Sequence, residues 1–309
     1  MEIKTLNPTQ QLPHFSELIS LLVAQFKPIH IYQFAQWIHH GETHSIFADT
    51  QRQEQVVYYL LVVTDGTASR ENEIQVFLDR NFTAAKVILH AHGQEVVQRN
   101  LKASNVYFSA VLKHAVLCYQ KEGAFSPEEI RMPNPKRWLG KAIVHWRNRS
   151  TMAQGFSEAA EHALEYSNER ICLYLLYQAT EQACVGLIWV FMGYKSDLRN
   201  IRRLLYTCGS FSQVPLQHFM GTLENQKLLD VMMKCFSQIR YEDDFSLEGK
   251  SIYRFVELVQ GFLELADSLC KERFKILESR LPKAICSEKF EEMNDNLPTG
   301  ILNEQITTI

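Results

Sequence analysis

The sequence lacks the cysteine patterns that would mark a disulfide-stabilised or zinc-binding protein. Its 309 residues contain seven cysteines but no C-x-x-C pair, and most of the cysteines lie inside apolar runs. Such residues are typically small buried hydrophobic side chains in a reducing compartment. The seven are Cys118, Cys172, Cys184, Cys208, Cys235, Cys270 and Cys286.

Long hydrophobic runs are also missing. The longest apolar stretch, residues 185–192, is too short to cross a bilayer. The polar residues 1–13 contain no signal-peptide core. We therefore expect a cytoplasmic protein with no membrane contact.

A strong excess of positive charge is absent as well. The net charge is −3, basic and acidic residues balance within 1–139 and within 140–280, and the acidic excess falls in 281–309. Proteins held on nucleic acid by phosphate contacts usually carry a clear positive bias. DNA is therefore not an expected partner, whereas a small local basic site remains compatible with this balance.

The first half of the chain alternates helix and strand signals. Residues 56–63, VVYYLLVV, form a β-branched and aromatic run typical of a strand buried on both faces. Residues 106–111 and 115–119 predict a hairpin. This order predicts a small mixed-sheet α/β domain over 1–120. The predicted helices cover 15–26, 71–81 and 93–102, and the other predicted strands cover 29–34 and 86–91.

Strand signals nearly vanish after a proline-containing linker over 121–139. Long helical patterns then predict an up-and-down helical bundle over 140–280. The polar residues 281–309 are expected to form a flexible tail. The predicted helices cover 140–166, 169–192, 197–207, 224–238 and 250–279, with a break at 209–221.

Two separated segments resemble the core of HEPN domains. YLLYQATEQACVGLIWVFMGYKSDLRNIRRLL (174–205) is similar to the HEPN helix that carries a Gln-Ala-x-Glu block and enters a Gly-Tyr-Lys turn. SQIRYEDDF (237–245) is similar to the Ala-Arg-Tyr segment of the last helix pair. The resemblance covers roughly 140–278. It implies a homodimer through the helical bundle, and the apolar Trp189, Val190 and Phe191 are candidates for its contact area.

The same segments contain a candidate polar site. Gln178 and Glu181 are three residues apart and share a helix face. Arg240, from a later helix, would pair with Glu181 as a structural ion pair, because buried charges need partners. In the alternative interpretation, Arg240, Tyr241 and Gln178 contact a nucleotide or RNA.

A second candidate site consists of four cations near one helix start. Arg199, Arg202 and Arg203 are expected at i, i+3 and i+4 of that helix, and Lys195 lies in the preceding turn. Such a group suits a phosphate, and a solvated helix face is the equal alternative.

The signature of HEPN ribonucleases is missing. In that family an Arg precedes a His by four to six intervening residues, which supplies a base for the 2′-hydroxyl and a cation for the phosphorane. The histidines of the predicted bundle are His145, His162 and His218, and none has an Arg at that spacing. Ribonuclease activity is therefore not the leading expectation.

HEPN domains are often joined to nucleotidyltransferase domains, and the order of elements in the first half fits that fold. An active enzyme of this class carries a Gly-Ser pair after its first strand and an Asp-x-Asp on its second strand to hold divalent metals. Gln33 and Phe34 stand in place of Gly-Ser, and Val57 and Tyr59 stand in place of the two aspartates. The resemblance thus implies a degenerate nucleotidyltransferase-like domain.

Two groups of histidines are candidate metal ligands. His90 and His92 alternate on a strand and share one face, while His39, His40 and His44 fall in a predicted loop. Neither group has a third ligand fixed by spacing. We expect no metal site and no cofactor.

Together these observations predict a non-catalytic nucleotide- or RNA-binding regulatory protein whose nucleotidyltransferase centre is lost. Two alternatives stay open. One is a divergent, toxin-like HEPN ribonuclease, and the other is a module that only binds a protein partner, as in a toxin–antitoxin pair.

Overall fold

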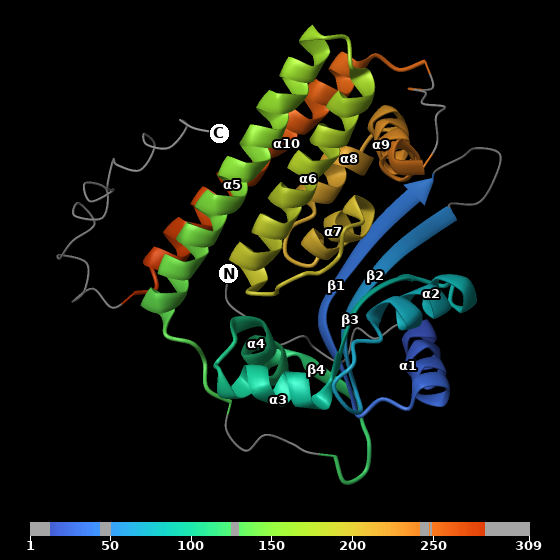
Figure 1. The fold of residues 1–309 in the computed structure, drawn as a ribbon. Coiled ribbons are helices and arrows are strands. Elements are labelled where there is room, and N and C mark those ends of the chain that lie inside the picture. The colour runs from blue at the N-terminus through green and yellow to red at the C-terminus, as the bar shows by residue number, and fades with distance from the viewer. Residues whose placement is uncertain (1–12, 44–50, 125–129, 242–246, 248, 282–309) are drawn as a thin grey trace, which may run out of the picture.

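A four-stranded mixed sheet organises the first part of the chain (Figure 1). The computed structural model describes residues 13–43, 51–124, 130–241, 247 and 249–281. The strands lie in the order β3-β2-β1-β4; β2 pairs antiparallel with β1 and parallel with β3, and β4 pairs antiparallel with β1. They are β1 (His30–Thr43), β2 (Gln51–Thr64), β3 (Lys86–Gly93) and β4 (Val116–Gln120).

Helices cover both faces of this sheet. One face packs on α1 and α2, through a cluster that includes Leu18, Tyr58 and Ile74. The other face meets α3, α4 and the C-terminal helices. The first four helices are α1 (Pro13–Phe26), α2 (Glu71–Asn81), α3 (Gln94–Lys102) and α4 (Val106–His114).

The prediction that residues 56–63 form a strand buried on both faces is confirmed. Every residue of this stretch is at most 6% exposed. Alternate side chains point to opposite faces of a strand, so Tyr58 packs with α1 while Val57 and Tyr59 face the C-terminal helices. The central strand therefore joins both layers of the molecule.

The C-terminal part is helical, as predicted. In Figure 1, α5, α6 and α10 form its long helices, while α7 lies between them and β1. A small mixed-sheet α/β part followed by a helical bundle is thus the observed fold class. The helices are α5 (Pro135–Glu165), α6 (Glu169–Met192), α7 (Ile201–Cys208), α8 (Val214–Met220), α9 (Leu223–Tyr241) and α10 (Ile252–Glu278).

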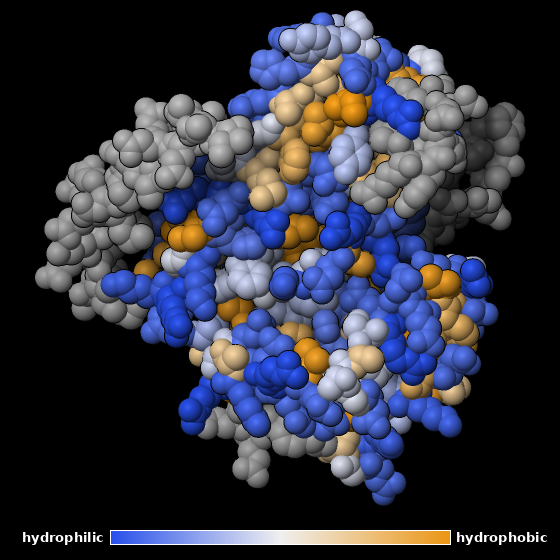
Figure 2. All heavy atoms as spheres, viewed as in Figure 1, coloured by the Kyte–Doolittle hydropathy of each residue, from blue (hydrophilic) through white to orange (hydrophobic). Residues whose placement is uncertain are grey.

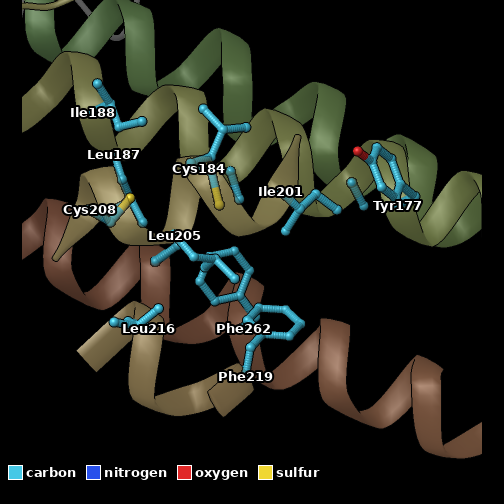
Figure 3. Close-up of a cluster of buried hydrophobic side chains, with 14 of the residues drawn as sticks. Tyr177, Cys184, Leu187, Ile188, Ile201, Leu205, Cys208, Leu216, Phe219 and Phe262 are labelled. Carbon is cyan, nitrogen blue, oxygen red and sulfur yellow. The ribbon is translucent and has the colours of Figure 1, made fainter. Parts of the chain in front are cut away.

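The core of the bundle is built where α6, α7, α8 and α10 meet. Figure 3 shows Leu205 of α7, Leu216 and Phe219 of α8, and Phe262 of α10 gathered in this core. The rings of Phe219 and Phe262 lie 5.0 Å apart at 67°, an edge-on arrangement that aromatic pairs favour. The same cluster continues to Leu61 on the sheet, so the two parts of the chain share one core.

Helix α6 is buried on nearly all sides. By length and composition α6 is long and apolar enough to cross a membrane, although the continuous apolar run 185–192 within it is too short. However, 67% of its most apolar 18-residue window is buried inside the molecule. It begins at the cap Asn168, whose side chain accepts from Ile171 N, and ends at Gly193 in the left-handed conformation. Such burial is typical of the core helix of a soluble protein.

Several sequence predictions for the elements are wrong. The predicted hairpin at 106–119 is a helix followed by a strand, because Asn105 caps α4 by accepting from Tyr107 N and Phe108 N. Strand β1 extends to Thr43, so His39 and His40 lie in a strand and not in a loop. His44 lies outside the described residues. The predicted break at 209–221 contains α8, and α5 starts at Pro135, earlier than the predicted 140.

Candidate functional site

The sheet position where the nucleotidyltransferase resemblance would place metal-binding carboxylates is apolar. Val57, Tyr59 and Ile88 form a small buried cluster, exposed by 6%, 1% and 5%. Phe34 of β1 and Tyr206 of α7 pack against it. Neither Val nor neutral Tyr supplies the oxygen charge that Mg²⁺ requires. This face of the sheet is therefore used for packing the helical part.

A buried histidine–tyrosine cluster lies next to that position, where β3 meets the two parts of the chain. It consists of His90 and His92 of β3, Tyr107 of α4 and Tyr194, which follows α6. His90 Nδ1 lies 2.7 Å from Tyr107 Oη, and His92 Nε2 lies 3.0 Å from Tyr194 Oη. The rings of His90 and Tyr194 stack with centroids 4.0 Å apart. The cluster thus joins the sheet to the end of α6.

A carboxylate and a guanidinium complete this junction. Tyr194 Oη donates to Glu71 Oε2 at 3.3 Å, and Arg203 Nη2 lies 3.8 Å from Glu71 Oε1. Arg203 Nη1 also donates to Asn72 Oδ1 at 3.2 Å. Burial raises the pKa of Glu71, and the nearby Arg203 partly opposes that rise. Arg203 of α7 therefore contacts the start of α2, through Glu71 and Asn72.

The cluster is electrostatically suited to structure and not to acid–base chemistry at neutral pH. Burial lowers the pKa of His92 to about 4 and lowers the pKa of the fully buried His90 well below its usual range. Burial also raises the pKa values of Tyr107 and Tyr194 well above their usual range. A general base works best with a pKa near the operating pH. These four side chains remain neutral and hold the two parts of the chain together.

The structure brings His90 and His92 to one face, as their spacing predicts, but gives each a tyrosine partner. In the part of the chain that the structure describes, no three His, Cys, Asp or Glu side chains are grouped to hold a metal ion. His39 stacks on Trp37 at 5.6 Å. Sequence reasoning did not find Tyr107 and Tyr194 as partners, because they lie 17 and 102 residues from the histidines that they contact.

The predicted cation group at the start of α7 is divided in the structure. The helix begins at Ile201 with Asn200 as its cap, so Arg199 precedes it and the expected i, i+3, i+4 row is wrong. Arg202 pairs with Asp230 of α9, and Arg203 faces Glu71. The four cations therefore do not converge on one phosphate. Arg199 and Lys195 are the exposed members of the group.

The other predicted site residues lie on α6 and α9. Gln178 is half-buried, and Glu181 is buried at 8% exposure. The side chains of Arg240 and Tyr241 lie outside the described residues. The Glu181–Arg240 pair and the ligand contacts of Arg240 and Tyr241 therefore stay predictions.

The three residues predicted to form the contact area of the dimer make packing contacts within the chain. Val190 is fully buried, the ring of Trp189 lies 4.8 Å from that of His145, and Phe191 stacks on Phe211 at 4.4 Å. In Figure 2 hydrophilic residues cover most of the visible face, and hydrophobic residues form separate patches on it. The apolar surface that suggested a dimer is therefore used for internal packing.

No protein-family model matches the chain, and no curated protein matches it either. Among solved structures it is similar to a nucleotidyltransferase-like protein from Exiguobacterium sibiricum 255-15. The two share 12% sequence identity, the match covers 86% of this chain and 79% of the other, and the TM-score is 0.26. A likeness at this level adds nothing to the fold derived above from the strands and helices themselves.

Proposed function

We propose that this protein is a non-catalytic, nucleotide- or RNA-binding regulatory protein of the nucleotidyltransferase–HEPN type, with its nucleotidyltransferase centre lost. The observation that carries the proposal is the covered sheet face. Val57 and Tyr59 stand where metal-binding carboxylates would be needed, and Tyr206 packs over them. Two-metal phosphoryl chemistry needs carboxylates that hold the metals, and the lining of the pocket beside Val57 and Tyr206 contains no aspartate or glutamate.

The binding part of the proposal rests on cations of the helical part. Lys195 and Arg199 are exposed next to the start of α7, and no carboxylate pairs with either within the described ranges. Gln178 of α6 is half-buried and belongs to the same segment, 174–205, that resembles HEPN domains. Arg202 and Arg203 contribute less to a ligand, since each already has a carboxylate partner.

The proposal also includes a homodimer and a cytoplasmic setting. The dimer follows from the HEPN resemblance and would use a face of the bundle other than Trp189–Phe191, because Val190 is fully buried and the rings of Trp189 and Phe191 pack on His145 and Phe211. Among the described residues, Cys172, Cys184, Cys208 and Cys270 are fully buried thiols that form no disulfide. Free thiols suit a reducing compartment.

A thermal-unfolding screen with and without Mg²⁺ tests the proposal. The ligands are ATP, GTP, a cyclic dinucleotide and a short single-stranded RNA. A ligand at about 100 times its Kd should stabilise the fold by about 2.7 kcal/mol, and we expect the shift to be independent of Mg²⁺. Lys195→Met and Arg199→Met should weaken it, while Arg202→Met serves as the matched control.

The catalytic side is tested in the same preparation. We expect no incorporation of labelled nucleotide into RNA or protein acceptors with Mg²⁺ or Mn²⁺. Metal-dependent incorporation above the level of a heat-inactivated sample would contradict the loss of the centre. An absence of any ligand-induced shift would remove the binding function and favour a module that binds only protein partners.

A further inference from the structure

A pocket of about 420 Å³ opens where the two parts of the chain meet at the lower end of the bundle. In Figure 1, α3 and α4 lie below the ends of α5 and α6 at this place. The α3–α4 turn forms one wall of the pocket and the start of α5 forms a second wall. Trp189 and Gly193 at the end of α6 form the third wall. Its volume falls within the range of about 300–1,000 Å³ that is common for small-molecule sites.

The charge of this pocket has a single sign. Lys102, Arg137 and Lys141 line it, and its lining contains no aspartate or glutamate. Within the described residues none of the three cations forms an ion pair. Three cations around one cavity repel one another, and an anion between them relieves that repulsion. Arg202 and Arg203 differ from these three cations, because each of them has a carboxylate partner.

Amide donors accompany the cations. Asn105 and Asn134 line the pocket and cap α4 and α5 through their side-chain oxygens. Asn105 Oδ1 accepts from Tyr107 N at 2.9 Å, and Asn134 Oδ1 accepts from Arg137 N at 3.0 Å. Because capping uses only the oxygen, the NH₂ group of each side chain remains able to donate. Phosphate oxygens accept from both amide and guanidinium donors.

Aromatic surface lies beside these donors. Trp138 and Trp189 both line the pocket, with ring centroids 5.9 Å apart at 48°. Trp138 is 8% exposed, so the half-buried Trp189 supplies most of the aromatic surface. Gly193 lets the end of α6 pack closely against Val106 and Trp138, since a Cβ there would lie 2.6 Å from Val106 Cβ and 3.2 Å from the ring of Trp138. Nucleic-acid bases pack favourably on aromatic side chains. The pocket thus combines an anion site with a surface for a planar ring.

We propose that this pocket binds a nucleoside phosphate, with Lys102, Arg137 and Lys141 contacting the phosphates and Trp189, supported by Trp138, contacting the base. A free nucleotide suits the site better than a long nucleic acid, because basic and acidic residues balance over each half of the chain. The inference goes beyond the proposed function and does not depend on it, since the pocket is distinct from the Lys195 and Arg199 region.

Isothermal titration calorimetry on the full chain tests the proposal, with ATP, GTP and inorganic pyrophosphate as probes. We expect Arg137→Met and Lys141→Met each to weaken nucleotide binding about tenfold, which corresponds to losing one charge-assisted hydrogen bond. Lys136→Met removes an exposed neighbouring charge on the same helix that does not line the pocket, and it should bind as wild type. Pyrophosphate should bind at least tenfold more weakly than ATP or GTP, because it lacks a base.

The outcomes separate the two proposals. Equal affinities for Arg137→Met and Lys136→Met would overturn the pocket assignment. If Lys195→Met abolished nucleotide binding and Arg137→Met left it unchanged, the pocket assignment would also be overturned. That result would support the proposed function. No heat with either nucleotide at 1 mM would overturn the pocket, and RNA binding would then remain as the test of the proposed function. The three cations are surface residues, so each variant should fold as the wild type does. Circular dichroism checks this for every variant.

Discussion

His92 gives this fold a defined sensitivity to acid. Its Nε2 lies 3.0 Å from Tyr194 Oη, and that hydroxyl donates to Glu71 Oε2 at 3.3 Å. Since the hydroxyl hydrogen goes to the carboxylate, the hydrogen of His92 belongs on Nε2, and acid adds a proton at Nδ1. Burial holds the pKa of His92 at about 4. Protonation therefore places a charge inside the junction between the two parts of the chain.

The sign and size of the effect follow from linkage. The unfolded chain protonates His92 near pH 6.5 and the folded chain near pH 4, so the unfolded state binds more protons between these values. The free energy of unfolding therefore falls as the pH drops through this window. A difference of about 2.5 pKa units corresponds to about 3.4 kcal/mol, and we expect about 2–3 kcal/mol because His92 keeps some solvent contact.

Glu71 acts in the opposite direction. Its folded pKa is raised above the unfolded value, so the folded state takes up this proton first. Its contribution to stability therefore grows as the pH falls from the folded towards the unfolded pKa. A single pH profile of the wild type mixes both effects. A comparison with a variant that lacks only the histidine titration separates them.

Urea unfolding of wild type and His92→Gln at about pH 7, 6, 5 and 4 makes this comparison. Glutamine keeps an N–H donor for Tyr194 but does not titrate. Between pH 7 and 4 the wild type should lose about 2–3 kcal/mol more than the variant. His162→Gln is the matched control, since its side chain is 73% exposed. Equal losses in wild type and His92→Gln would refute the reasoning.

Three further substitutions test the packing described above. Gly193→Ala should destabilise the fold by about 2–4 kcal/mol in urea unfolding, because it combines a positive φ with a clash against Val106; a neutral effect would contradict that contact. Phe262→Ala should cost about 3–5 kcal/mol by the same measurement, since the ring is fully buried in the bundle core. Arg202→Met should change stability by less than about 1 kcal/mol, because its pair with Asp230 is exposed, and a larger loss in thermal unfolding would show that the pair is structural.

The sequence predicted best where one physical signal was strong. The run VVYYLLVV is apolar or aromatic throughout, which favours a strand buried on both faces of a sheet. The structure places it in such a strand. The long helices were equally predictable, because apolar residues repeat at helical spacing over several turns. Strand alternation also requires Val57 and Tyr59 to share one face, and in the structure both lie in the same small cluster.

The prediction was wrong where local propensity and tertiary packing disagree. Residues 106–111 are rich in β-branched and aromatic side chains, which favour strands. Yet Tyr107, Phe108 and Val111 share one helix face and are all buried, and Asn105 supplies the cap. Burial of that face outweighs an intrinsic preference of about 1 kcal/mol or less per residue. No signal within this segment alone distinguishes the two outcomes.

The candidate site was the least predictable part, because it depends on which cations the fold neutralises. Arg202 and Arg203 look like phosphate ligands in the sequence, but Asp230 and Glu71 reach them from distant parts of the chain. Lys102 lies before the predicted linker over 121–139, Arg137 lies near the end of that linker, and neither stands out in the sequence. The fold brings them to one pocket and places no carboxylate in its lining. An anion site in this protein is therefore best sought among the cations that folding leaves unpaired, and not among those that are closest in sequence.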